Sequence, residues 1–329
     1  MGRIRAQALV ECGVANIVTV YDKHAINNSD WPVSTNIDEV LNDNRIDAVF
    51  LSLPNHLNKD MAIKAMLAGK HVFCEKPPAF NAQDVIEIRE VEAGTHKKLM
   101  YGFNHSHHGA VIKMKELVAS GKYGRVLWMR GRYGKSVDES YFDTWRADKE
   151  SAGGGILLDQ GIHMLDLFNH IGGVGFDNTH AFVSSLYWNL DGVEDNVFAI
   201  LKNSQNGLVS SLHSTMTQWR HLFSLEVFLE AGYMVLHPNY RNHVPSDFGD
   251  NPFRIGYAID IRFGHSFGHR QGFKERVQRH LIVHFDKDVL IPAICVTCLH
   301  DAPPSAISDV RLPASNHGSS HWVWKSPAW

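Results

Sequence analysis

The chain has 329 residues, 44% of them hydrophobic and 20% charged, with a formal net charge of −3. This composition is that of a globular protein with room for two domains, and the small net charge gives no basic surface for nucleic acid or a membrane. Because no apolar run approaches the ~18–20 residues of a membrane span and MGRIRAQALVECG has no signal-peptide core, we predict a cytoplasmic protein.

The first hundred residues alternate short β-branched or apolar runs with helical patterns, which predicts βαβ units and a Rossmann-type doubly wound parallel sheet. Strands are predicted at residues 16–22, 46–54, 71–77 and 98–105, and helices at 58–68 and 82–93. In open parallel sheets, ligands bind outside the carboxyl ends of the strands. The predicted strand ends carry Asp22, Pro54, Asn55, Glu75, Lys76 and Asn104.

The stretch VFCEKPPAF places an acid and a base, Glu75 and Lys76, between an apolar run and two prolines. A rigid proline turn at a strand end can aim such a pair into the crevice where ligands bind. The alternative interpretation is a pair of exposed turn charges, and Glu-Lys-Pro by itself does not decide between the two.

Asp22 ends the first of these strands. In a dinucleotide-binding fold, an acid at this position accepts hydrogen bonds from the adenosine ribose and repels a 2′-phosphate, which favours NAD over NADP. Aspartate at a strand end is also a common turn residue, and the neighbouring Lys23 weakens the preference for NAD.

A helix over residues 114–120 and a strand over 125–134 are predicted to open the second half. The glycines at 153–155 then lead into a run with helical period, and such glycines let another backbone approach the start of a helix. The polar stripe of this helix is either its solvated side or a functional surface. The stripe consists of Asp159, His163, Asp166 and His170, and Leu158, Ile162, Leu165 and Phe168 cover another face.

From Ala181 onward the pattern has period two, which predicts a largely antiparallel sheet. Strands are predicted within residues 180–190, 196–203, 207–216 and 222–236, and Asn206-Gly207 is a hairpin signal. We therefore predict a dinucleotide-binding domain at 1–105 and an α+β substrate and oligomerisation domain at 106–236. Residues 237–329 form an atypical proline- and histidine-rich tail, in which the sequence pattern does not define helices or strands.

The four cysteines, Cys12, Cys74, Cys295 and Cys298, are too few and too scattered for a disulfide framework. The pair at 295 and 298 has no second ligand pair with matching spacing, so we interpret the cysteines as structural or incidental and predict no metal site.

The strand-end CEKP, the Pro54-Asn55 pair and GGGILLDQGIHMLDL, with Asp159 and His163 four residues apart, carry a family resemblance. From about Ile4 to Leu236 the chain resembles the glucose-fructose oxidoreductase / inositol dehydrogenase / MocA family of NAD(P)-dependent oxidoreductases. YGFNHSHHG and SLHSTMTQWRHLFSLEVF are also similar to members that act on nucleotide-linked sugars.

The resemblance implies an NAD- or NADP-dependent hydride transfer at a hydroxyl or keto carbon of a sugar, nucleotide-sugar or polyol. It places Lys76 near the nicotinamide and the reacting hydroxyl, His163 as the group that exchanges the hydroxyl proton, and Asp159 beside it. It implies a homo-oligomer formed through the antiparallel sheet. The implied cofactor-binding positions are Asp22, Pro54, Asn55, Glu75, Lys76, Asn104, Trp145 and Arg146.

These residue types suit the reaction that the resemblance implies. Histidine has an unperturbed pKa of about 6.5, close to the working pH of a proton acceptor. A lysine ammonium stabilises negative charge that develops on the substrate oxygen, and an aspartate orients its neighbours. The nicotinamide itself performs the hydride chemistry.

The sequence also departs from the family pattern. Members normally begin with a strand and a G-x-G-x-x-G turn, whereas GRIRAQALVECG resembles the first helix already under way, so we expect an incomplete dinucleotide-binding domain. The tail from His237 is unlike the family's C-terminal part. Two alternatives therefore stay open: a catalytically impaired or non-catalytic family member that keeps an association sheet, and a metal-dependent sugar isomerase with Asp159, His163 and Asp166 as ligands.

Overall fold

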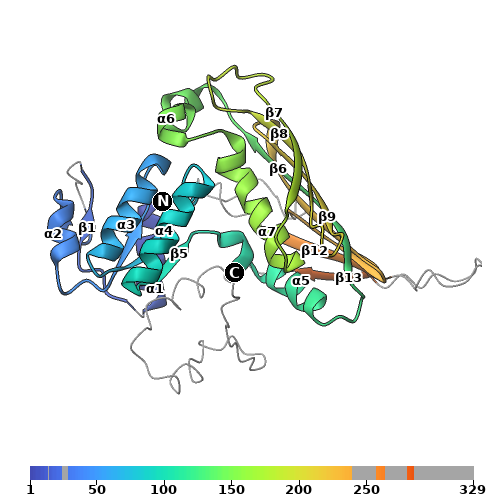
Figure 1. The fold of residues 1–329 in the computed structure, drawn as a ribbon, viewed down its shortest axis with the longest axis horizontal. Helices are drawn as coiled ribbons and strands as arrows, with labels where there is room; N and C mark the ends of the chain where they lie inside the picture. Colours follow the sequence, from blue (N-terminus) through green and yellow to red (C-terminus); the bar gives the residue numbers. More distant parts are fainter. Residues whose placement is uncertain (14, 24–28, 239–256, 264–279, 285–329) are drawn as a thin grey trace, which may run out of the picture. The chain divides into compact units, whose positions relative to one another are not determined.

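The computed structural model describes residues 1–13, 15–23, 29–238, 257–263 and 280–284 (Figure 1). Residues 1–48 belong to one compact unit and residues 49–290 to a second, and each is described by itself. In the described ranges, every helix is too short or too polar to cross a membrane. The predictions for Cys295 and Cys298 fall outside the described residues.

The first unit contains two helices and a short parallel strand pair. α1 (Gly2–Cys12) ends at Gly13, whose φ of 70° is the left-handed conformation that glycine adopts without strain. β1 (Val20–Tyr21) pairs in parallel with β2 (Val33–Ser34), and α2 (Ile37–Asn42) follows. The strand predicted at 16–22 is therefore only two residues long, and Asp22 comes directly after it, as predicted.

The second unit begins with a three-stranded sheet in the order β3-β4-β5. Its strands are β3 (Ala48–Leu51), β4 (His71–Cys74) and β5 (Leu99–Tyr101), and its helices are α3 (Asn58–Leu67) and α4 (Ala82–Thr95). β4 and β5 pair in parallel. The predicted alternation of strands and helices is confirmed, because its hydrophobic periods were long enough to separate the two element types.

α5 (Gly109–Ala119) starts five residues before the helix predicted at 114–120. The reason is a local cap: His108 Nδ1 accepts a hydrogen bond from the Ala110 N–H at 3.2 Å. The cap satisfies one of the free N–H groups of the first turn. β6 (Val126–Ser136) follows and agrees with its prediction.

The larger sheet has eight strands in the order β13-β12-β11-β10-β6-β9-β8-β7. Adjacent strands in this sheet are antiparallel except for the parallel pair β6 and β9. The prediction of a largely antiparallel sheet is therefore confirmed. β12 and β13 lie in the tail, where the sequence predicted no element. The remaining strands are β7 (Asn178–Ser184), β8 (Asn196–Lys202), β9 (Val209–Thr215), β10 (Thr217–Leu229), β11 (Gly232–Pro238), β12 (Tyr257–Phe263) and β13 (His280–His284).

Helix α7 (Ile162–Gly172) lies along one face of this sheet (Figure 1). Met164, Leu167, Phe168 and Ile171 are buried there, whereas the predicted apolar face shares only Phe168 with this set. The helix carries apolar side chains around most of its circumference, so contact with the sheet selects the buried ones. Gly131 of β6 permits the close approach, since a Cβ there would lie 2.3 Å from Met164 Cγ.

The glycines at 153–155 sit where the chain enters this helix. Gly153 has a φ of 77°, and a Cβ at that position would lie 2.2 Å from the Phe80 ring. A Cβ on Gly155 would lie 1.9 Å from the backbone oxygen of Glu194. The expectation that another backbone approaches the start of this helix is confirmed.

We expect Gly155→Ala to destabilise the protein by about 1–3 kcal/mol or more, because backbone rather than a flexible side chain must move to admit the methyl group. Gly94→Ala is the matched control, because Gly94 lies in α4 with open space around it. Alanine at this helical position should increase the free energy of unfolding by at most about 1 kcal/mol. Chemical denaturation of both variants measures the difference. Equal stability of Gly155→Ala and the unchanged protein would contradict the close contact between Gly155 and the Glu194 backbone.

Candidate active site

Lys76 lies just beyond the carboxyl end of β4, and its side chain reaches Asp159 in a cluster of polar groups. The Glu75 N–H donates to Leu51 O at 2.9 Å, which extends the pairing of β3 with β4. The Asn58 amide donates to the carbonyls on both sides of Lys76, to Glu75 O at 3.3 Å and to Pro77 O at 2.9 Å. The backbone of Lys76 is therefore held at two points, and only its side chain is free to reach out.

Asp159 lies in a π-helical turn, Leu157–Gly161, that precedes α7. The backbone N–H groups at the start of this turn donate hydrogen bonds to one residue, Glu194. Its carboxylate accepts hydrogen bonds from Gly155 N at 2.6 Å and Leu157 N at 2.9 Å, and its carbonyl accepts one from Ile156 N at 3.0 Å. Three successive N–H groups of a helix start are thus satisfied, which sets where the following residues point.

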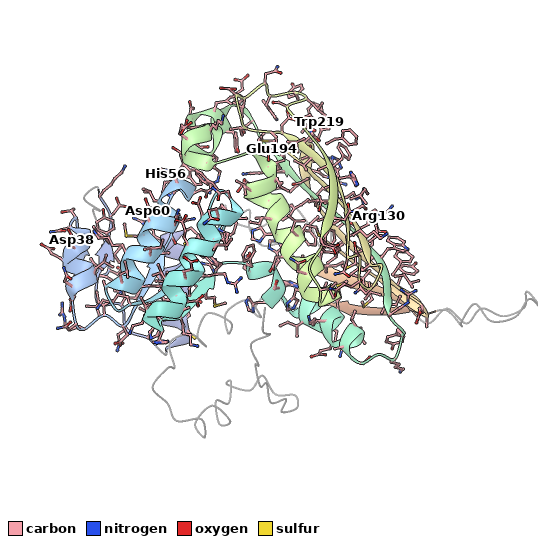
Figure 2. All side chains as sticks on the ribbon, in the orientation of Figure 1. Asp38, His56, Asp60, Arg130, Glu194 and Trp219 are labelled. Atoms are coloured by element: carbon pink, nitrogen blue, oxygen red, sulfur yellow. The ribbon has the colours of Figure 1, made fainter. Side chains whose placement is uncertain are left out.

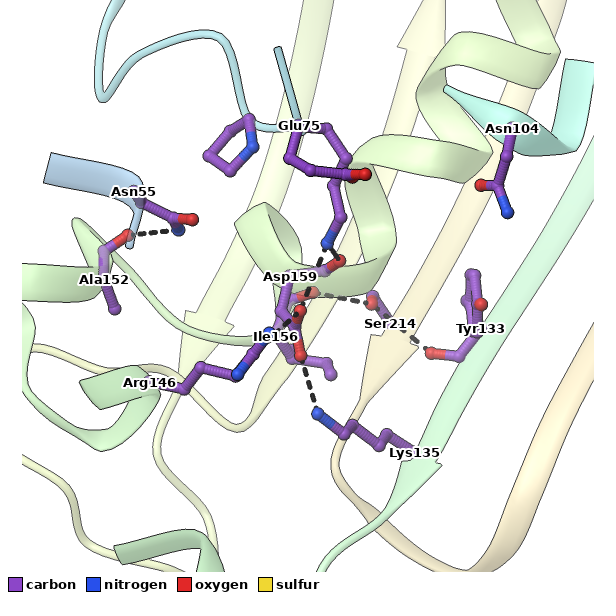
Figure 3. Close-up of polar contacts among 12 residues, drawn as sticks. Asn55, Glu75, Asn104, Tyr133, Lys135, Arg146, Ala152, Ile156, Asp159 and Ser214 are labelled. Atoms are coloured by element: carbon purple, nitrogen blue, oxygen red, sulfur yellow. Dashed lines mark hydrogen bonds and ion pairs between the residues drawn. The ribbon is translucent and has the colours of Figure 1, made fainter. Parts of the chain in front are cut away.

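Three cationic side chains surround the Asp159 carboxylate (Figure 3). Lys76 Nζ donates to the Asp159 carbonyl and lies 3.2 Å from Oδ1, Lys135 Nζ lies 2.8 Å from Oδ2, and Arg146 Nε lies 3.8 Å from Oδ1. Burial alone would raise the pKa of Asp159, but Lys76, Lys135 and Arg146 together hold it well below its ordinary value. Asp159 is therefore a carboxylate at neutral pH.

His163 lies among aromatic rings close to this cluster. Its ring centroid is 4.4 Å from that of His105, 6.0 Å from Phe103 and 6.2 Å from Tyr133. The Tyr133 hydroxyl lies 3.3 Å from His105 Nε2. Burial, with smaller effects of His108 and Lys76, lowers the pKa of His105 to about 3, so His105 is a neutral imidazole beside His163.

Several other predicted site residues lie in the same unit. Asn55 donates to Ala152 O at 2.9 Å, and Asn104 Oδ1 lies 3.1 Å from His105 Nδ1. Arg146 stacks over the Trp145 ring at 4.3 Å while it faces Asp159. Glu75 is buried, and Pro54 precedes the short turn Asn55–Leu57. Asp22 belongs to the other unit, where its N–H donates to Ser34 O at 3.2 Å.

The predicted polar stripe is not a solvated surface and is not carried by one regular helix. Asp159 belongs to the π turn, whereas His163, Asp166 and His170 belong to α7. The Ser106 hydroxyl donates to Asp166, and burial raises the pKa of Asp166 to about 6. Burial also lowers the pKa of His170, to about 4.

The metal-ligand interpretation of Asp159, His163 and Asp166 is not supported by these contacts. Both carboxylate oxygens of Asp159 face lysines, and Asp166 accepts a hydrogen bond from a serine. Within the part of the chain that the structure describes, no group of three or more His, Cys, Asp or Glu side chains is arranged to hold a metal ion. Cys74 is a buried free thiol.

The candidate site also contains three residues that were not predicted from the sequence: Tyr133, Lys135 and Glu194. Tyr133 and Lys135 are two apart on β6 and therefore share one face of the strand, which is a signal available in the sequence. Glu194 lies in the loop before β8, and its sequence offers no comparable signal. Its contact with Gly155 joins residues 39 positions apart.

Two family descriptions match different parts of the chain. Residues 3–103 match the description "Oxidoreductase family, NAD-binding Rossmann fold", and residues 111–235 match "GFO/IDH/MocA C-terminal domain". Together the two matches cover more than half of the chain.

Among curated relatives, a 1,5-anhydro-D-fructose reductase of Ensifer adhaerens is 30% identical over 56% of this chain and 54% of its own length. A levoglucosan dehydrogenase of Pseudarthrobacter phenanthrenivorans is 33% identical over 44% of this chain and 36% of its own length. The chain thus spans about half or less of the length of these relatives.

Among solved structures, a levoglucosan dehydrogenase in complex with NADH and L-sorbose has the same fold. It superposes with a TM-score of 0.72 at 20% identity and covers 91% of this chain and 86% of that one. The two family matches and this shared fold show that the chain belongs to the GFO/IDH/MocA family of oxidoreductases, with an NAD-binding Rossmann domain followed by the family's C-terminal domain.

Proposed function

We propose that the protein is an NAD(P)-dependent oxidoreductase that transfers a hydride between a nicotinamide cofactor and a hydroxyl or keto carbon of a sugar, nucleotide-sugar or polyol. The observation that carries the proposal is the Lys76 ammonium held by Asp159 at a strand end, in the same unit as the buried imidazole of His163. The named activities of the relatives, a sugar reductase and a sugar dehydrogenase, support the substrate class.

The residues of this cluster have the properties that the reaction requires. In our proposal, His163 accepts the proton of the substrate hydroxyl during oxidation and returns it during reduction. The Lys76 ammonium stabilises the negative charge on the substrate oxygen, and Asp159 keeps that ammonium in one place through two acceptor atoms. The bound nicotinamide supplies the hydride acceptor or donor.

The residues present fit the nicotinamide and ribose parts of such a cofactor. Asn55, Glu75 and Asn104 lie at or just beyond strand ends, where dinucleotides bind in this fold, and Asp22 follows β1. The sequence contains no G-x-G-x-x-G turn for the pyrophosphate. In our proposal, the cofactor-binding residues of the second unit are Pro54, Asn55, Glu75, Lys76, Asn104, Trp145 and Arg146. Asp22 is proposed separately as a cofactor-binding residue of the first unit.

We also propose that a second copy of the chain binds to the face of the large sheet opposite α7. Figure 2 shows Arg130 and Trp219 on that face. Phe182 of β7 and Ile200 of β8 are exposed on neighbouring strands, and Trp219 of β10 is 99% exposed. Large exposed apolar side chains of this kind mark sites of protein association.

Lys76→Met should lower kcat by about a hundredfold or more, because the charge that stabilises the substrate oxygen is lost. NADH affinity should change by less than about threefold, since other residues hold the cofactor. Steady-state kinetics and NADH fluorescence titration measure both quantities. Lys59→Met is the control, because Lys59 pairs with Asp84 and Glu87 instead. Unchanged turnover would remove Lys76 from the mechanism.

NADH should bind about tenfold more tightly than NADPH, because the Asp22 carboxylate repels the 2′-phosphate. Asp22→Asn removes the charge and should abolish the preference. Fluorescence titration with both cofactors tests this. If neither cofactor binds while the fold is intact, the non-catalytic alternative is correct.

Phe182→Glu combined with Ile200→Glu should convert the proposed dimer to monomer, because burying two unpaired carboxylates in an interface is costly. Sedimentation analysis measures the mass of each form. Ile4→Glu, at an exposed apolar residue of α1, serves as the control. A monomeric unchanged protein would refute association through this face.

A further inference from the structure

Lys135 is the second lysine at the Asp159 carboxylate, and it comes from a different part of the chain than Lys76. It lies near the end of β6, on the face of the strand that also carries Tyr133. Its ammonium is 2.8 Å from Asp159 Oδ2 and 5.2 Å from the centre of the Tyr141 ring. The side chain is only 23% exposed, so its charge is poorly screened by water.

The two lysines contact different atoms of Asp159, and Figure 3 shows Lys135 on one side of its carboxylate. Lys135 faces Oδ2, whereas Lys76 faces Oδ1 and the backbone carbonyl. A carboxylate that is bound on one oxygen only is able to rotate about its Cβ–Cγ bond. With both oxygens engaged, Oδ1 stays directed at Lys76.

We propose that Lys135 is a positioning residue: by holding Asp159 Oδ2 it directs Oδ1 at Lys76 and so keeps the Lys76 ammonium in the place where it acts on the substrate oxygen. This proposal rests on the dehydrogenase function proposed above. Lys135 itself does not need to touch the substrate.

The charged and titratable groups around Asp159 determine what the loss of Lys135 does. Lys76 and Arg146 are the remaining cations, and Arg146 is both more distant, at 3.8 Å, and more exposed. Tyr141 interacts with Asp159 and with Glu194, and His221 interacts with Lys135. Burial raises the pKa of Asp159, and the nearby cations lower it. Without Lys135 fewer cations remain, so the pKa of Asp159 must rise.

The sign of the pH effect follows from this balance. In the unchanged protein the pKa of Asp159 is below its unfolded value of about 3.9, so the charged contacts are present above that pH and are lost only in stronger acid. In Lys135→Met the contacts should be lost at a higher pH. The titration of the Asp159 carboxyl group itself should therefore move to a higher pH.

The test combines an NMR titration with kinetics of the full chain. Aspartate labelled with ¹³C at Cγ is titrated in the unchanged protein, Lys135→Met and Lys135→Arg, and Asp159→Asn identifies the resonance of Asp159. We expect the pKa of Asp159 to rise by about one unit or more in Lys135→Met, kcat to fall about tenfold and KM for the sugar to change less. Lys135→Arg should restore both the pKa and kcat to a large extent.

Lys113→Met is the control, because Lys113 pairs with Glu116 on the exposed side of α5. It should leave the Asp159 resonance and kcat unchanged. The same Asp159 pKa in Lys135→Met and the unchanged protein would overturn the proposal. So would a Lys135→Arg variant whose Asp159 pKa and kcat both remain those of Lys135→Met. If the unchanged protein oxidises no sugar, that result refutes the proposed function. The NMR titration still tests the role of Lys135, because it measures the pKa of Asp159 without turnover.

Discussion

The arrangement of the candidate site depends on the carboxylate of Asp159, whose side chain is 12% exposed, and on the cations that keep it charged. Removing a carboxylate from water costs several kcal/mol, and only close opposite charges with good hydrogen bonds offset that cost. The structure provides Lys76 from the end of β4, Lys135 from β6 and Arg146 from the loop that follows. Because each cation comes from a different segment, their shared contact with Asp159 ties together three parts of the unit.

A second carboxylate, Glu194, determines where Asp159 lies. It binds three N–H groups at the start of the π turn, and the approach is possible only because residue 155 has no side chain. The loop before β8, the glycines at 153–155 and the π turn are therefore held together through Glu194. Lys76 has a parallel arrangement, since Asn58 binds the carbonyls on both sides of it. In both cases a neighbouring residue holds the backbone on which the side chain is mounted, which keeps that side chain in one geometry.

The surroundings give the titratable groups different states. Asp159 is ionised by its cations, while burial keeps His105 neutral and raises the pKa of Asp166 to about 6. Asp159 and Asp166 are the same residue type with pKa values shifted in opposite directions, so that difference arises from their environments. His105 therefore places a neutral ring, and not a positive charge, beside His163.

The sequence by itself determined the order of strands and helices, the largely antiparallel second sheet and the family, because these rest on hydrophobic period and on local motifs such as CEKP and DQGIH. It also placed Lys76 at a strand end and Asp159 four residues before His163. It did not determine the early start of α5, which depends on a histidine cap, or the strands of the tail, which depend on pairing with β11. Only the tertiary structure decided that Lys135 and Glu194 belong to the site and which side of α7 is buried. Those outcomes depend on contacts between residues tens of positions apart, and no local pattern records such contacts.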